Sequence, residues 1–448
     1  MQLTVLPSNA LKGTFGGSTT PGLPGDKSIS HRAALLAGMA SGDSHIENFM
    51  VSGVTRVLLK ALELLGVEVE LSGNVLRVHS PGYRKWKTPA VALNCGNSAT
   101  TMRLLAGAIA ASGVQAVLDG SDSLRRRPMD RIIEPLLAMG VTIQGTPDGC
   151  APLKIGGRSQ RTKLHPLEYS LPVASAQVKT CLLLAGLAAS GQIILHEPET
   201  SRDHTERMLS GMGIQIDETF LTGHTIRLSP ESEYEISPLN MQVPGDFSSA
   251  AFLIVAGLIA PGSQIQLSGV GLNETRTGLL DVLKTMGGNI LITGQSILHS
   301  EPVGDLIIRS SALQGVTVQG SLVVRMIDEF PALAAAAIYA LGTTSVRDAE
   351  ELHYKETDRI TSLCEELSNI GATIAASPDG FILQGDRSIH GGTVASHKDH
   401  RLAMSLAVAG LASQTGVVVK NAEIIRESFP AFIDVLGSAG ANIQVVED

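Results

Sequence analysis

Residues 23 to 42, LPGDKSISHRAALLAGMASG, join a group of charged and polar side chains to an apolar run. Lys27, Ser28 and Arg32 directly precede residues 33 to 40, whose composition predicts a buried helix. The first turn of a helix carries N–H groups without intrahelical partners. A lysine, a serine and an arginine beside them make an anion site. For this stretch alone, a serine-capped helix with solvated charges is an equally good interpretation.

The same juxtaposition recurs before five further apolar runs, which follow GNSATTMR, SAQVK, PGDFSS, IDEFP and HKDHR. Helix capping alone explains Ser98, Ser248 and Ser249 at such positions. Capping does not explain the cations, so we expect the polar residues to form the ligand-facing ends of buried helices. These cations are Lys27, Arg32, Lys179 and Arg401.

The elements that position these residues follow a sixfold repeat of about 75 residues. Each unit contains a buried helix, a strand, an amphipathic helix and one or more further strands. Phrases such as KALELLGVEV and EPLLAMGVTI predict the amphipathic helix, a glycine C-cap and a strand. The landmark glycines are Gly66, Gly140, Gly213, Gly287, Gly371 and Gly440.

Six such units predict an α+β protein in which sheets cover buried helices, and two domains of three units are the natural grouping. Gly-Pro punctuation near residues 21–25 and 243–245 marks the crossings between them. We therefore expect one domain from 1–24 plus 244–448 and another from 25–243. A repeat scaffold that only binds another protein remains an alternative, and it predicts no gathering of Lys, Arg and acidic residues.

Composition excludes several classes of protein. The net charge is -9 and aromatic residues make up 3% of the 448, which argues against nucleic-acid binding despite Arg-rich pieces such as RPMDR. The four cysteines form no CxxC motif, so we expect them to pack as small apolar residues in a reducing cytoplasm. The chain opens without signal-peptide features, and its apolar stretches are too short to span a membrane.

The motifs PGDKSISHR, GNSATTMR, LRRRPM, SAQVK, SRDHTERM, YKETDR and KDHRLAM resemble, in order and spacing, the 5-enolpyruvylshikimate-3-phosphate synthase family. The resemblance spans essentially the whole chain. It implies the enolpyruvyl transferase fold, with two domains of three βαβαββ units each. It also implies transfer of the enolpyruvyl group of phosphoenolpyruvate to the 5-hydroxyl of shikimate 3-phosphate, with release of phosphate. This step belongs to the shikimate pathway of aromatic amino acid biosynthesis.

Both substrates are polyanions, so a site for them needs several guanidinium groups, which fit carboxylates and phosphates bidentately. The resemblance implies that shikimate 3-phosphate contacts Lys27, Ser28, Arg32, Ser175, Ala176, Gln177, Arg202, Asp328 and Lys355. It implies that phosphoenolpyruvate contacts Lys27, Ala99, Arg127, Gln177, Arg359 and Arg401. No cofactor or metal is implied, and we expect a cytoplasmic monomer without nucleic-acid or membrane partners.

The reaction is acid–base chemistry, which two carboxylates in different environments can divide. The family-like candidates are Asp328 and Glu356, and Lys27 is a third candidate that could relay a proton or support the leaving phosphate. An N-cap role is the alternative for Asp328. An ion pair with Arg359 on a helix surface is the alternative for Glu356. The sequence does not decide which group moves which proton.

Two departures from the family pattern resemble the glyphosate-tolerant subgroup. Glu427 stands where many members have a lysine before Thr-Phe-Pro, and SRDHT at 201–205 replaces a tyrosine-bearing segment. Ala99 occupies a position where glyphosate-sensitive members have glycine. The related UDP-N-acetylglucosamine enolpyruvyl transferases typically carry a cysteine in an arginine-containing loop. The corresponding stretch SDSLRRRPMD has none, which disfavours that alternative.

Overall fold

The computed structural model describes residues 1–17, 21–220, 223–230 and 235–447, and the chain divides into two compact units. Unit 1 comprises Met1–Asp26 and Pro244–Asp448, and unit 2 comprises Lys27–Val243. The first crossing thus follows Asp26, two residues later than the boundary expected from the sequence. Of the expected domains, residues 18–20, 221–222, 231–234 and 448 lie outside the described part.

Each unit contains three four-stranded sheets in its described part. Every sheet combines one parallel pair of neighbouring strands with two antiparallel pairs, and the parallel pair always lies at one edge of the sheet. In unit 2 the first sheet has the strand order β14 (Asn240–Gln242), β3 (Ser41–Glu47), β5 (Val75–Pro81) and β4 (Glu68–Ser72). The second has the order β6 (Leu93–Asn94), β7 (Ala116–Asp119), β9 (Leu153–Ile155) and β8 (Ile143–Gln144). The third has the order β10 (Leu167–Ser170), β11 (Ile193–Glu197), β13 (His224–Leu228) and β12 (Ile216–Thr219). In unit 1 the first sheet has the strand order β2 (Lys12–Gly16), β15 (Gln264–Gly271), β17 (Glu301–Arg309) and β16 (Asn289–Leu298). The second has the order β18 (Thr317–Val318), β19 (Leu341–Val346), β21 (Gly380–Asp386) and β20 (Thr373–Ser377). The third has the order β22 (Gly392–Ala395), β23 (Val417–Lys420), β1 (Gln2–Leu6) and β24 (Asn442–Val446).

The helices fall into the two series that the repeat predicts. The apolar series is buried along nearly its whole length: α1 (Lys27–Met39), α3 (Ala99–Ser112), α5 (Ala176–Gly186), α7 (Phe247–Ile259), α10 (Phe330–Ile338) and α12 (His400–Gly410). The amphipathic series is α2 (Gly53–Leu64), α4 (Asp130–Ala138), α6 (His204–Gly211), α8 (Gly278–Thr285), α11 (Arg359–Asn369) and α13 (Phe432–Ser438). Short helical turns complete the chain: α9 (Ser321–Arg325), η1 (Tyr83–Lys85), η2 (Leu124–Arg126), η3 (Glu350–Tyr354) and η4 (Ala422–Glu427).

The six landmark glycines end the amphipathic helices in the left-handed backbone region, with φ between +83° and +99°. Only glycine adopts this conformation without a steric cost, so it allows the chain to leave the helix and enter the next strand. The predicted glycine C-caps and the α+β fold class are confirmed.

Buried helices pack against one another inside each unit, and the sheets cover them. Helices α3 and α5 approach so closely that a Cβ atom on Gly107 would lie 2.1 Å from the carbonyl oxygen of Cys181. No helix within the described ranges has the length and apolar character needed to cross a lipid bilayer.

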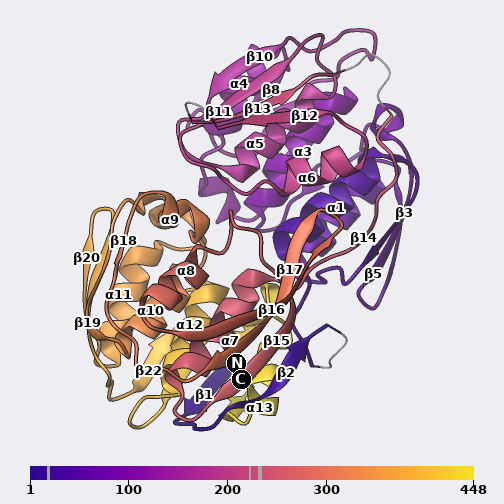
Figure 1. Ribbon diagram of the computed structural model, residues 1–448. Coiled ribbons are helices and arrows are strands. Elements are labelled where there is room, and N and C mark those ends of the chain that lie inside the picture. The colour runs from indigo at the N-terminus through magenta and orange to yellow at the C-terminus, as the bar shows by residue number, and fades with distance from the viewer. Residues whose placement is uncertain (18–20, 221–222, 231–234, 448) are drawn as a thin grey trace. The chain divides into compact units, whose positions relative to one another are not determined.

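The two ends of the chain complete unit 1 (Figure 1). Strand β1 lies between β23 and β24, with Gln2 opposite Lys420 on one side and Val446 on the other. Strand β2 pairs in parallel with β15, more than two hundred residues later in the sequence. In Figure 1 the indigo β1 and β2 accordingly lie with red, orange and yellow elements of the C-terminal half.

Candidate active site

The N-terminal turn of α1 in unit 2 holds Lys27, Ser28 and Arg32. Lys27 is its first residue, and the Arg32 side chain is almost fully buried. Arg32 donates from Nε to Thr205 Oγ1 (2.8 Å), from Nη1 to the carbonyl of Ser28 (3.1 Å) and from Nη2 to the carbonyl of Ala176 (3.2 Å). These bonds connect the starts of α1, α5 and α6, and they orient the guanidinium through oxygens that carry no full charge.

The starts of α3 and α5 are joined by Gln177. Its Oε1 accepts from Arg103 Nη1 (2.7 Å), and its Nε2 donates to Thr100 Oγ1 (3.0 Å). Ser175 caps α5 by accepting from the backbone N–H of Val178 (3.4 Å). The structure therefore gives both Ser175 and Gln177 a structural contact in addition to any contact with a ligand.

Ala99 is the first residue of α3 and only 7% exposed, directly after the capping residue Ser98. Arg127 approaches the same helix start, with Nη2 at 3.5 Å from Asn97 Oδ1. Arg202 approaches α1, with Nη1 donating to Ser28 Oγ (3.2 Å). Unit 2 thus gathers nine of the predicted site residues at the N-terminal ends of its three buried helices: Lys27, Ser28, Arg32, Ala99, Arg127, Ser175, Ala176, Gln177 and Arg202.

His31 adds no positive charge to this end of the unit at neutral pH. Burial above all, together with the charges of Lys27 and Arg32, lowers the pKa of His31 to about 4. The neutral ring is held by a 2.9 Å hydrogen bond between Nδ1 and the carbonyl oxygen of Lys27.

In unit 1, Asp328 is surrounded by cations. Its carboxylate lies 3.4 Å from Lys355 Nζ, 3.5 Å from Arg359 Nη1 and 3.6 Å from Arg401 Nη2. Glu329, not Asp328, stands at the N-cap position of α10, so the capping interpretation of Asp328 is wrong. The Asp328 side chain keeps 17% of its surface exposed.

Glu356 and Arg359 form a close ion pair, with 2.6 Å between Oε2 and Nη2. Glu356 precedes α11, whose capping residue is Asp358, so the pair does not lie on a helix surface as the alternative interpretation assumed. Arg359 also binds Asp399, which caps α12, through Nε (2.7 Å). Burial disfavours the Arg359 charge, but Asp399 and Glu356 outweigh that effect and raise the pKa of Arg359.

A further arginine, Arg276, was not among the site residues predicted from the sequence. Its buried guanidinium pairs with Asp26 and, at 3.0 Å, with Asp246, the capping residue of α7. The repeated PGD tripeptide at 24–26 and 244–246 was the available signal for the two acids. No motif marks Arg276, which is far from both in the sequence.

Three residues differ from their expected roles. Lys179 does not face a ligand, because its side chain is fully buried against Glu197 (2.9 Å) and Glu206 (2.7 Å). Ser248 and Ser249 are not caps, because their backbone N–H groups donate to the true cap, Asp246.

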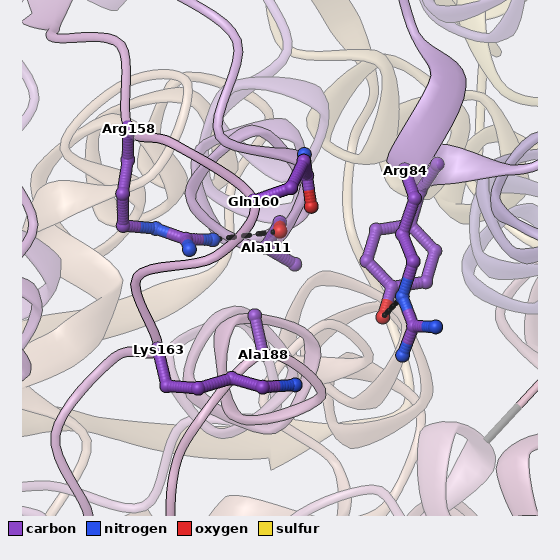
Figure 2. Close-up of a pocket in the computed structure, with 7 residues that line it drawn as sticks. Arg84, Ala111, Arg158, Gln160, Lys163 and Ala188 are labelled. Atoms are coloured by element: carbon purple, nitrogen blue, oxygen red, sulfur yellow. Dashed lines mark hydrogen bonds between the residues drawn. The ribbon is translucent and has the colours of Figure 1, made fainter. Parts of the chain in front are cut away.

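A cavity of about 240 Å³ lies at the C-terminal ends of α3 and α5, where Ala111 and Ala188 line it (Figure 2). Arg158 lines it and donates to the carbonyl of Ala111 (3.0 Å), and Lys163 and Arg84 lie around it. Cations at a helix C-terminus satisfy its free carbonyls, so this cavity needs no ligand to explain its charge. Among the described residues, no three metal-ligating side chains gather as a metal site.

Comparisons with known proteins agree with one another. The family described as EPSP synthase (3-phosphoshikimate 1-carboxyvinyltransferase) matches residues 18–436. Proteins named 3-phosphoshikimate 1-carboxyvinyltransferase from Roseiflexus sp. (strain RS-1) and Salinibacter ruber are 44% and 45% identical over 439 residues. These alignments cover 97% of this chain and 98% and 99% of the relatives. A solved EPSP synthase from Acinetobacter baumannii is 39% identical, with a TM-score of 0.86 and full coverage of both chains. An enolpyruvyl transferase from Streptomyces tendae, 19% identical over 99% of this chain and 98% of its own, shares the fold with a TM-score of 0.78.

Proposed function

This chain belongs to the EPSP synthase family, and we propose that it acts as a 3-phosphoshikimate 1-carboxyvinyltransferase in aromatic amino acid biosynthesis. In this reaction the 5-hydroxyl oxygen of shikimate 3-phosphate bonds to C2 of phosphoenolpyruvate while the hydroxyl loses its proton. The methylene carbon gains a proton to give a tetrahedral intermediate. Loss of phosphate, together with a proton from the new methyl group, restores the enol ether.

We assign substrate binding in unit 2 to Lys27 and Arg32 at the start of α1 and to Arg202 in the loop before α6. Helix N-termini and guanidinium groups both attract phosphate and carboxylate groups. The hydrogen bonds of Arg32 to Thr205 and to the carbonyls of Ser28 and Ala176 orient its guanidinium at these helix starts.

We assign the proton transfers to Asp328 and Glu356, and the observation that carries this assignment is the environment of Asp328. Three cations within 3.4–3.6 Å favour its ionised form, which accepts a proton. Glu356 shares Arg359 with Asp328, so a change of charge on one carboxylate is felt by the other. Lys27 is the further candidate for support of the leaving phosphate.

The decisive test is release of inorganic phosphate from phosphoenolpyruvate, measured with and without shikimate 3-phosphate. We expect release only when both substrates are present, together with formation of the enolpyruvyl ether detected by mass spectrometry. Release that does not depend on shikimate 3-phosphate would contradict the proposed function.

We further propose that the enzyme tolerates glyphosate because Ala99 places a methyl group beside the phosphoenolpyruvate site. Its position at the buried start of α3 supports this proposal, since a side chain there has little room to move. We also propose a cytoplasmic monomer that binds neither nucleic acid nor membranes, in keeping with the net charge of -9.

A further inference from the structure

A cluster of charged side chains that takes no part in the proposed reaction lies beneath the loop that carries Arg202 in unit 2. We call Lys179, Glu197, Glu206, Glu218 and His224 the buried ion cluster, in which Glu218 lies at the edge with 29% of its side chain exposed. The side chains of Lys179 and Glu197 are 0% exposed, and that of His224 is 1% exposed. His224 bridges two acids, with 2.9 Å from Nδ1 to Glu197 and 2.7 Å from Nε2 to Glu218.

The buried ion cluster binds all the hydrogen-bonding groups of Ser201. The Ser201 backbone N–H donates to Glu197 Oε2 (3.3 Å), and its hydroxyl donates to Glu197 Oε1. Its carbonyl accepts from Lys179 Nζ (3.3 Å). The residue directly before Arg202 is therefore fixed on both sides of its Cα atom, which restricts the direction in which Arg202 leaves the loop.

The other end of the same loop is tied to Arg32. Thr205 Oγ1 accepts from Arg32 Nε (2.8 Å) and lies 2.6 Å from Thr180 Oγ1, the residue next to Lys179. Residues 201–205 thus connect the buried ion cluster to Arg202 and Arg32, the two arginines assigned to shikimate 3-phosphate.

Stability is a weak reason for such a cluster. Replacing a buried ion group by well-packed apolar side chains is often neutral or stabilising, because each buried charge loses its hydration. Apolar side chains cannot, however, bind the N–H, hydroxyl and carbonyl groups of Ser201 together. The directional hydrogen bonds of Glu197 and Lys179 are what this arrangement supplies and an apolar core would not.

We propose that Glu197 is a positioning residue for the shikimate 3-phosphate site: balanced by Lys179 and His224, it fixes Ser201 and thereby directs Arg202 toward the ligand. This inference rests on the proposed function. It extends that function to residues that touch no substrate and act only through Arg202.

The test compares Glu197→Gln and His224→Gln with the matched control His196→Gln. His196 is the neighbour of Glu197 on β11 and pairs with Glu168 on the surface of the same sheet (3.0 Å). We expect KM for shikimate 3-phosphate to rise about tenfold to a hundredfold in Glu197→Gln, and in the same direction by less in His224→Gln. KM for phosphoenolpyruvate and the values of His196→Gln should stay near wild type.

A double-mutant cycle separates positioning from a general loss of structure. If Glu197 acts through Arg202, adding Glu197→Gln to Arg202→Ala should produce little further loss of affinity, measured by calorimetry with shikimate 3-phosphate. An equal loss in both backgrounds, or unchanged affinity in Glu197→Gln and His224→Gln, would overturn the inference.

Failure of the proposed function is distinguishable, because the wild-type protein would then neither bind shikimate 3-phosphate nor release phosphate. If Glu197→Gln leaves His224 without its buried acid and the protein unfolds, the double variant Glu197→Gln/His224→Gln removes both partners and keeps the pair of Lys179 with Glu206 (2.7 Å). The same cycle with that double variant then decides the question.

Discussion

Arginines near the starts of the buried helices contact different groups in the two units. In unit 1, Arg276, Arg359 and Arg401 each lie beside carboxylates, with Asp246 3.0 Å from Arg276 and Asp399 2.7 Å from Arg359. In unit 2, Arg32 is oriented by hydroxyl and carbonyl oxygens, and Arg103 by the amide of Gln177. Hydroxyl, carbonyl and amide oxygens fix the direction of a guanidinium through hydrogen bonds, whereas carboxylates do so through both charge and hydrogen bonds. We propose that Arg32 in unit 2 binds a substrate anion and that Asp328 and Glu356 in unit 1 transfer protons, beside the predicted substrate contacts Arg359 and Arg401.

Removing one carboxylate charge from unit 1 should have the largest effect. We expect Asp328→Asn or Glu356→Gln to lower turnover by about 10²-fold or more, because a positioned acid or base contributes at least that factor. Steady-state phosphate release measures it, and calorimetry should show that Glu356→Gln still binds shikimate 3-phosphate. The control is Asp281→Asn, which removes an exposed acid of the same unit paired with Arg325 at 2.7 Å. Near-normal turnover in either variant would remove that residue from proton transfer.

Replacing the Arg32 guanidinium in unit 2 tests the other half of the comparison. Arg32→Lys keeps the charge but loses the planar fork, so affinity for shikimate 3-phosphate should fall about tenfold to a hundredfold, with a smaller effect on turnover. The matched control is Arg125→Lys, whose arginine forks onto Asp119 at 2.9 and 2.7 Å on the surface. Equal affinities of both variants and the wild type would contradict the assignment of anion recognition to Arg32.

The start of α3 offers a change that should alter an inhibitor rather than the substrates. Ala99→Gly removes one methyl group, and a steric intrusion of that size in a packed site costs on the order of 1–3 kcal/mol. We expect glyphosate to inhibit Ala99→Gly about ten to a hundred times more strongly than wild type, with similar kcat/KM for phosphoenolpyruvate. Inhibition curves that coincide would show that the methyl group is not responsible for tolerance.

The smallest expected effect is on the pH dependence of stability, and it comes from the lowered pKa of His31 in unit 2. The pKa of His31 is about 4 in the folded protein and about 6.5 when unfolded, so the unfolded chain binds the proton more readily between these values. Stability is therefore complete above pH 6.5 and falls as the pH is lowered toward 4. Between pH 7 and pH 5.5, the free energy of unfolding should fall by about 1 kcal/mol more in wild type than in His31→Asn. Denaturant titrations at the two pH values measure this, and equal changes in wild type and His31→Asn would contradict it.

The repeat was readable from the sequence because it depends on local rules. Glycine at Gly66 or Gly371 ends a helix in the left-handed region, and an apolar run with no polar face must be buried. The motifs also predicted the family, which the comparisons confirm.

The ion-pair partners of charged residues could not be predicted from the sequence, because pairing depends on which side chains the fold brings together. Lys179 and Arg32 both stand near a helix start in polar phrases, yet Lys179 points inward to Glu197 and Glu206. Arg276 meets Asp26 across 250 residues of sequence, a separation that no local pattern spans. The roles assigned to individual site residues remain predictions that the proposed variants test.

The position of β1 between β23 and β24 has a consequence for synthesis on the ribosome. Every strand of unit 2 belongs to residues 27–243, so this unit has all of its sheet partners once that stretch has emerged. The opening strand of unit 1 emerges first, yet its neighbours at 417–420 and 442–446 are translated last. At about 5–20 residues per second, β1 waits tens of seconds with unpaired backbone edges while a complete unit folds between it and its partners. Slower translation of the second half would therefore lengthen the time that β1 spends without its sheet partners.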